Sequence, residues 1–223
     1  MGERSDNPFR IGWKAVRANV WSMLVLWIIA VATVVAYYFV PGVADLLSPV
    51  GAWQERTGWV AAFANCAIFC GALPYIVYLC KGHSGPRHPL LTAVLQSVFV
   101  GVCGIVCNWF FGLQTTWFGN GHDLRTLLLK TAVDQFVWTA FVLSPVVSLF
   151  YAMIGMWMEH SRGNFSFDDF VRRDFLPNLI TGWCIWIPVI FVVYAFPLVL
   201  QVQVLGFVSA FWVIVCREIG VRK

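Results

Sequence analysis

The chain has 223 residues and a formal net charge of +4, and 60% of its residues are apolar while only 12% are charged. This balance excludes an ordinary soluble domain, in which about a quarter of the residues are charged. The composition therefore predicts an integral membrane protein.

Long charge-free tracts locate the expected membrane spans. Residues 18–40, 57–80, 90–121 and 175–216 contain no Asp, Glu, Lys or Arg, and a transmembrane helix needs about 20 such residues. A further tract, residues 131–158, contains Asp134 and no other charged residue.

The last tract, as one helix, would be about twice as long as the hydrocarbon core is thick, so we expect it to turn back. Proline removes a backbone donor and disfavours helix at the residue before it. We therefore predict a helix break marked by Trp186, Pro188 and Pro197, with almost no loop between the two halves. The predicted fold is a single all-α membrane domain over residues 1–223, with six spans at about 18–40, 57–80, 90–118, 126–158, 175–196 and 198–216.

The distribution of basic residues predicts the orientation, because cytoplasmic loops are enriched in Lys and Arg. With six spans, twelve of the fifteen basic residues fall on one side, and five spans would weaken this asymmetry. We therefore expect both termini to be cytoplasmic, in a bacterial inner membrane, with a mitochondrial inner or peroxisomal membrane as the alternative. The twelve are Arg4, Arg10, Lys14, Arg17, Lys81, Arg87, Arg162, Arg172, Arg173, Arg217, Arg222 and Lys223.

The cysteines fit helix packing better than metal binding. Ala62, Cys66 and Cys70 repeat every four residues, as do Cys103 and Cys107, which is typical of the small-residue seams that let membrane helices approach closely. Zinc would require four converging ligands, with thiolates deprotonated in hydrocarbon. We expect no metal and no cofactor.

An enzymatic function is not expected either. The sequence GHSG at residues 82–85 faintly resembles a nucleophile elbow, but it links two spans and lacks the strand-to-helix turn that such an elbow needs. All four histidines fall in predicted loops or at span ends, and no phosphate-binding loop, zinc-protease helix or dinucleotide fingerprint occurs. The expected partners are the lipid bilayer and a second copy of the chain or a membrane complex, with no nucleic acid.

The segment after the fourth span predicts a short amphipathic helix from about Ser166, with Asp168 and Asp169 in its first turn. This helix either lies along the membrane interface or leads directly into the fifth span.

The start of the fourth span carries the main candidate site. Asp123 is the expected N-cap of a helix that places Lys130 and Asp134 four residues apart, on one face. One interpretation is an interfacial ion pair in which Lys130 reaches towards water. The other is a polar cavity or pathway lined by Asp134 and Gln135, since a carboxylate inside a membrane usually faces a partner or water.

These residues, together with Arg173, Asp174, Phe175 and the Trp186–Pro197 region, resemble the Mpv17/PMP22 family of small multi-pass membrane proteins over roughly residues 125–216. The family occurs in peroxisomal and mitochondrial inner membranes and has bacterial-looking relatives. The resemblance implies an all-helical protein that forms a pore or permeates metabolites, without a settled substrate.

The sequence also departs from the family pattern. Ile187 separates Trp186 from Pro188, where the family has an adjacent tryptophan and proline. An apolar run at residues 190–193 replaces polar residues, and Gln201 replaces the usual arginine. These changes argue against a hydrated pore lined by this helix.

Two functions therefore remain open. The first is a channel-like or permease-like protein for ions or small metabolites, with Asp134, Gln135 and Lys130 as its polar focus. The alternative is a non-catalytic structural or assembly subunit of a larger membrane complex.

Overall fold

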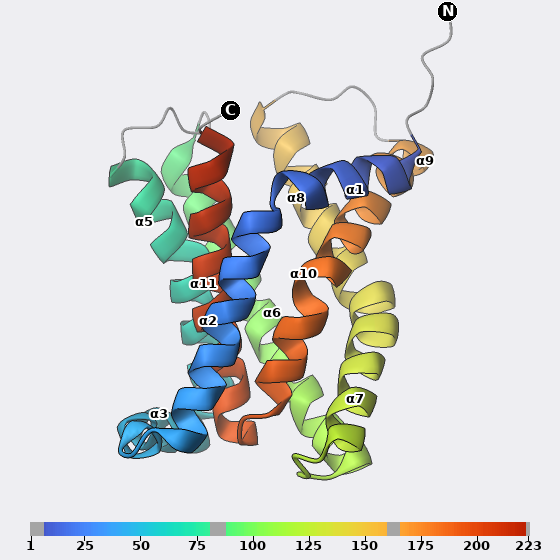
Figure 1. Ribbon diagram of the computed structural model, residues 1–223. Helices are drawn as coiled ribbons and strands as arrows, with labels where there is room; N and C mark the ends of the chain where they lie inside the picture. Colours follow the sequence, from blue (N-terminus) through green and yellow to red (C-terminus); the bar gives the residue numbers. More distant parts are fainter. Residues whose placement is uncertain (1–6, 81–87, 160–165, 222–223) are drawn as a thin grey trace, which may run out of the picture.

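The computed structural model describes residues 7–80, 88–159 and 166–221, and every regular element in these residues is helical (Figure 1). Five helices within them are long and apolar enough to cross a membrane. They are Val20–Phe39, Trp59–Val77, Pro89–Phe118, Leu124–Ile154 and Phe167–Tyr194. The predicted all-α membrane bundle is confirmed.

A final helix follows the fifth long apolar helix and packs beside it (Figure 1). The elements in chain order are α1 (Pro8–Ala18), α2 (Val20–Phe39), α3 (Val43–Thr57), α4 (Trp59–Cys66), η1 (Ala67–Ala72), α5 (Leu73–Cys80), α6 (Pro89–Phe118), α7 (Leu124–Val133), η2 (Asp134–Leu143), α8 (Ser144–Glu159), α9 (Phe167–Asp169), η3 (Phe170–Phe175), α10 (Leu176–Tyr194) and α11 (Leu198–Val221). The three η segments are π-helical and continue the α-helices around them.

Two of these helices, α1 and α3, lie before and between the first two predicted spans. α1 begins where the Asn7 side chain accepts the N–H of Phe9 and Pro8 occupies the first turn, a favourable start for a helix. α3 carries Asp45 in its first turn and Arg56 in its last turn, which suits the helix dipole. Figure 1 shows α1 and α3 at opposite ends of the bundle, each turned away from the direction of α2.

The fourth long helix begins as predicted. The Asp123 carboxylate accepts the backbone N–H of Thr126 at 3.0 Å and its hydroxyl at 2.8 Å. Asp123 is therefore the N-cap of α7, and the helix continues through η2 into α8.

The segment after Ser166 is the beginning of the fifth long helix. α9, η3 and α10 form one continuous helix from Phe167 to Tyr194, so this segment leads directly into the span. Exposed ion pairs one turn apart join Asp168 to Arg172 and Asp169 to Arg173.

Trp186, Pro188 and Pro197 were predicted to mark the break before the last helix, but the chain breaks only near Pro197. α10 runs through Trp186 and Pro188 without ending, and the chain turns at residues 195–197, so only Pro197 stands at the break. Pro188 lacks an N–H, which weakens the preceding turn, but the Trp27 indole donates to the carbonyl of Ile185 at 3.2 Å. This bond ties α10 to α2 close to the proline, and α10 continues through Pro188 to Tyr194.

α11 is the counterpart of the sixth predicted span. It is 24 residues long, and its stretch Leu198–Phe211 is apolar. The Gln201 amide donates to the carbonyl of Phe196 at 3.0 Å and closes the turn between α10 and α11. Gln201 thus has a local structural role at this turn.

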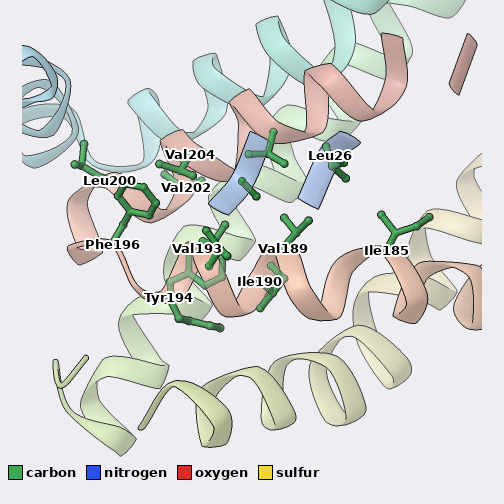
Figure 2. Packing of buried hydrophobic residues seen from close by; sticks show 14 of the residues in the cluster. Leu26, Ile185, Val189, Ile190, Val193, Tyr194, Phe196, Leu200, Val202 and Val204 are labelled. Carbon is green, nitrogen blue, oxygen red and sulfur yellow. The ribbon is translucent and has the colours of Figure 1, made fainter. Parts of the chain in front are cut away.

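The apolar core lies between α2, α10 and α11 (Figure 2). Val189 and Val193 of α10 and Val202 and Val208 of α11 are fully buried, and Leu26 of α2 packs with them. The apolar run at residues 190–193 belongs mostly to this core. This part of α10 therefore stabilises the bundle by burying apolar surface.

A second contact region joins α4 and η1 to α6 through small residues. Ala62 and Cys66 are buried, and Gly104 of α6 lies so close that an added Cβ would be 2.6 Å from Cys66 Sγ and 2.7 Å from the Ala62 carbonyl oxygen. The position of Ala62 and Cys66 in a close-packed seam agrees with the prediction from their spacing.

Candidate functional site

The Asp134 carboxylate lies inside the bundle, with 3% of the residue exposed. Its Oδ2 accepts the Tyr194 hydroxyl at 2.8 Å, and its Oδ1 accepts the Gln135 amide at 2.7 Å and the Thr139 hydroxyl at 3.3 Å. Donors to both oxygens reduce the free-energy penalty of placing a carboxylate in a membrane interior. The acid predicted from sequence therefore points inward.

The network extends to two other spans. Tyr194 belongs to α10, and its hydroxyl accepts the Gln114 amide of α6 at 3.2 Å. The same amide donates to the carbonyl of Lys130 in α7 at 3.0 Å. Gln114 and Tyr194 are both buried, so three long helices meet in one hydrogen-bonded group.

The π-helical segment η2 begins at Asp134 and contributes to this arrangement. A π-helix bonds each N–H to the carbonyl five residues earlier and frequently marks a functional site. The Trp183 indole of α10 donates to the carbonyl of Gln135 at 2.9 Å. A second bond thereby holds α10 against the beginning of η2.

Lys130 is buried, but it does not form the expected ion pair with Asp134. Within the described ranges, no carboxylate lies within 4.0 Å of its ammonium group. The Nζ atom instead lies 5.7 Å from the centre of the Tyr194 ring, a cation–π distance. The interfacial ion-pair interpretation is wrong for this structure, because the Asp134 carboxylate turns to Tyr194, Gln135 and Thr139.

Several oxygens around this group have no hydrogen-bond partner in the described part of the chain. They are Gln114 Oε1, Gln135 Oε1 and Thr131 Oγ1, and all three are buried. Buried polar atoms are normally satisfied by protein or water. The site therefore offers acceptors that a water molecule, a cation or a ligand N–H or O–H could use.

A separate polar group lies where α3, α6 and α11 meet. Gln54 donates to Asn108 Oδ1 at 3.0 Å and accepts the Gln203 amide at 2.7 Å. Gln54 and Gln203 are buried. This group contains no charged side chain and acts as a hydrogen-bonded joint between the helices.

The Asp134 carboxylate accepts the amide of its neighbour Gln135, and the Lys130 ammonium lies over the ring of Tyr194, the same tyrosine that donates to Asp134. Gln114, Thr139 and Tyr194 were not identified from the sequence. Gln114 is one of four side-chain amides in the charge-free tract 90–121, so its type alone did not single it out. In the described residues no group of three or more His, Cys, Asp or Glu is placed to hold a metal ion.

Comparison with known proteins finds a family match for one segment of the chain. Residues 166–216 match the Mpv17 / PMP22 family, which confirms the resemblance over the C-terminal part of the chain. The match covers α9, η3, α10 and most of α11 and includes Tyr194, while Lys130, Asp134 and Gln135 lie before it. No curated protein and no solved structure matches the chain.

Proposed function

We propose that this membrane protein, whose C-terminal part matches the Mpv17 / PMP22 family, is a channel-like or permease-like protein for ions or small metabolites. Asp134 and Gln135 would form the polar focus of its pathway, with Lys130 beside them. The observation that carries the proposal is the buried Asp134 carboxylate, hydrogen-bonded across spans to Tyr194.

The chemistry of the site supports this proposal. Ionisable groups within membrane spans are expensive and commonly mark ion or substrate pathways. The free oxygens of Gln114 and Gln135 lie in the same network as the carboxylate. A solute that passes between α6, η2 and α10 would exchange its water for these acceptors.

The apolar packing limits where such a pathway can run. Ile190 and Val193 of α10 are buried in the core, whereas Tyr194 reaches the polar network. A pathway would therefore follow the boundary between α10 and the fourth long helix rather than the side of α10 that faces α2.

The proposed orientation places both termini in the cytoplasm of a bacterial cell, with the organellar membranes as alternatives. It is supported by the position of α1 and of the end of α11 at the same end of the bundle (Figure 1). Reporter fusions after Lys223 and within residues 119–122 should report opposite sides of the membrane. Signals from the same side would contradict the orientation.

The function can be tested with purified protein in liposomes and a panel of ions and small organic acids. Wild-type protein should increase the flux of at least one solute, and Asp134→Asn should reduce that flux by tenfold or more. Asp169→Asn is a matched control, because Asp169 is an exposed carboxylate paired with Arg173. No flux with folded wild-type protein, or equal flux in both variants, would refute the proposal.

A second candidate is a non-catalytic assembly subunit. It is favoured by the completeness of the hydrogen bonds to Asp134, which a purely structural joint between helices would also show. Co-purification from native membranes with a fixed set of partner proteins, without flux in liposomes, would support this alternative.

A further inference from the structure

The N-terminal helix α1 has an exposed face of unusual composition. Phe9 and Trp13, four residues apart, are 62% and 44% exposed although both are large and aromatic. Arg10, Lys14 and Arg17 follow at helical spacing and are also exposed. At about 100° per residue, the aromatic pair forms one stripe and the basic residues form the adjoining stripe.

Another face of α1, next to the aromatic stripe, is fixed to the bundle. Gly12 lies against Ile180 of α10, and the Thr181 hydroxyl donates to the Gly12 carbonyl at 3.3 Å. Val16 is buried in the apolar core. The close approach at Gly12 sets which face of α1 points away from the protein.

The position of α1 places this exposed face near the membrane surface. α1 ends at Ala18, and α2 begins its apolar crossing at Val20. Figure 1 shows α1 lying across the end of the bundle rather than along the spans. Trp21, in the first turn of α2, is also highly exposed, and tryptophan is enriched at the level of the lipid headgroups.

The charge of α1 is unbalanced. It contains three basic residues and no acidic residue, and Arg17 lies over the Trp13 ring at 5.8 Å. By contrast, Arg172 and Arg173 of the neighbouring η3 are paired with Asp168 and Asp169. Within the described residues, no carboxylate is paired with Arg10, Lys14 or Arg17, so these groups can meet an external anion.

We propose that the face of α1 formed by Phe9, Arg10, Trp13, Lys14 and Arg17 binds the headgroups of anionic phospholipids in the surrounding bilayer. Helices with aromatic residues beside a basic stripe lie in the membrane interface, and anionic lipids attract Lys and Arg there. The aromatic rings enter the headgroup region while the basic groups contact lipid phosphates.

The test uses full-length protein in mixed micelles with equal amounts of phosphatidylglycerol and phosphatidylcholine. After repurification, the ratio of the two bound lipids is measured by mass spectrometry. Wild-type protein should retain an excess of phosphatidylglycerol, and Arg10→Gln with Lys14→Gln should reduce that excess by about fivefold or more. In 1 M NaCl the excess should also fall, because screening shortens the range of charge interactions to about 3 Å.

Two matched variants separate the effect of α1 from a general effect of charge. Arg56→Gln with Arg125→Gln removes the same charge from exposed sites in α3 and α7 and should leave the lipid ratio unchanged. Arg10→Lys with Lys14→Arg preserves the charge on α1 and should retain the excess. Equal lipid ratios in the two glutamine double variants would overturn the proposal, as would loss of the phosphatidylglycerol excess when inorganic phosphate is added at a concentration equal to that of the lipid, at which screening is weak.

Discussion

The hydroxyl of Tyr194 in α10 donates a hydrogen bond of 2.8 Å to Oδ2 of Asp134 in η2, which lies 60 residues earlier in the chain. Tyr194 also receives the Gln114 amide and carries the Lys130 ammonium over its ring. One side chain therefore connects a carboxylate, an amide and a cation from two other spans.

Replacement of Tyr194 by phenylalanine should destabilise the bundle while preserving its shape. The ring remains, but Asp134 loses a donor, and a hydrogen bond to a charged group contributes about 1.5 to 3 kcal/mol. Thermal unfolding in detergent should show a lower midpoint. Tyr37→Phe is the control, because Tyr37 packs its ring against Phe196, and an equal loss in both variants would contradict the role given to the Tyr194 hydroxyl.

Replacement of Asp134 should show a graded effect on folding. Asparagine keeps one acceptor oxygen for the surrounding donors, whereas leucine leaves Tyr194, Gln135 and Thr139 without their acceptor. Each unsatisfied buried group costs about 1 to 3 kcal/mol. The fraction of monodisperse protein after heating should therefore fall from wild type to Asp134→Asn and further to Asp134→Leu. A leucine variant as stable as the asparagine variant would argue against a buried network.

The seam between α4 and α6 predicts a position-specific effect of alanine. Gly104→Ala places a methyl group against the Ala62 backbone carbonyl, which cannot move away as a side chain can, and overpacking typically costs about 1 to 3 kcal/mol. Gly112→Ala in the same helix meets nothing within 4 Å and should be neutral or slightly stabilising. Similar melting temperatures for the two variants would contradict the close approach at Gly104.

The N-cap at Asp123 predicts that the stability of the first turn of α7 depends on pH. The N–H and hydroxyl of Thr126 donate to the carboxylate and lower the pKa of Asp123 below its usual value. A lowered pKa in the folded state means that this stabilisation is complete above the usual pKa and is lost as the pH falls through the lowered value.

Hydrogen exchange provides the measurement for this cap. At neutral pH, Asp123→Ala should reduce the protection of the Thr126 amide, whereas Asp123→Asn should retain it because asparagine is also a good N-cap. In acid, the wild type should lose protection and the asparagine variant should not. Protection that is identical in wild type and Asp123→Ala would show that the cap has no effect.

The long spans could be predicted because a charge-free tract of sufficient length has few alternatives to crossing a membrane. α1 and α3 were missed because both are short and carry charges, so a search for charge-free tracts passes over them. Local signals were nevertheless present in Asn7 with Pro8 and in Asp45 with Arg56. The prolines alone did not fix the end of α10, because the helix continues through Pro188 and the chain turns only at residues 195–197.

The candidate site was predictable only in part. The cost of an isolated acid favoured an inward Asp134, and this orientation is what the structure shows. Its partner Tyr194 stands among apolar residues at the end of a span, where tyrosine commonly marks the membrane interface. Neither this pairing nor the π-helical start of η2 has a local sequence signature. Helical spacing made Lys130 the partner of Asp134 in one of the two interpretations, and tertiary contacts decided otherwise.

The central claim is that Asp134, held by its hydrogen bond to Tyr194, belongs to the polar focus through which a solute passes. The most direct measurement is liposome flux for wild type, Asp134→Asn, Tyr194→Phe and the double variant, each verified as folded. We predict that both single variants lose most of the flux and that the double variant loses no more than the more severe of them, because both changes remove one connection. Wild-type flux in all three variants, or losses that multiply in the double variant, would contradict the claim.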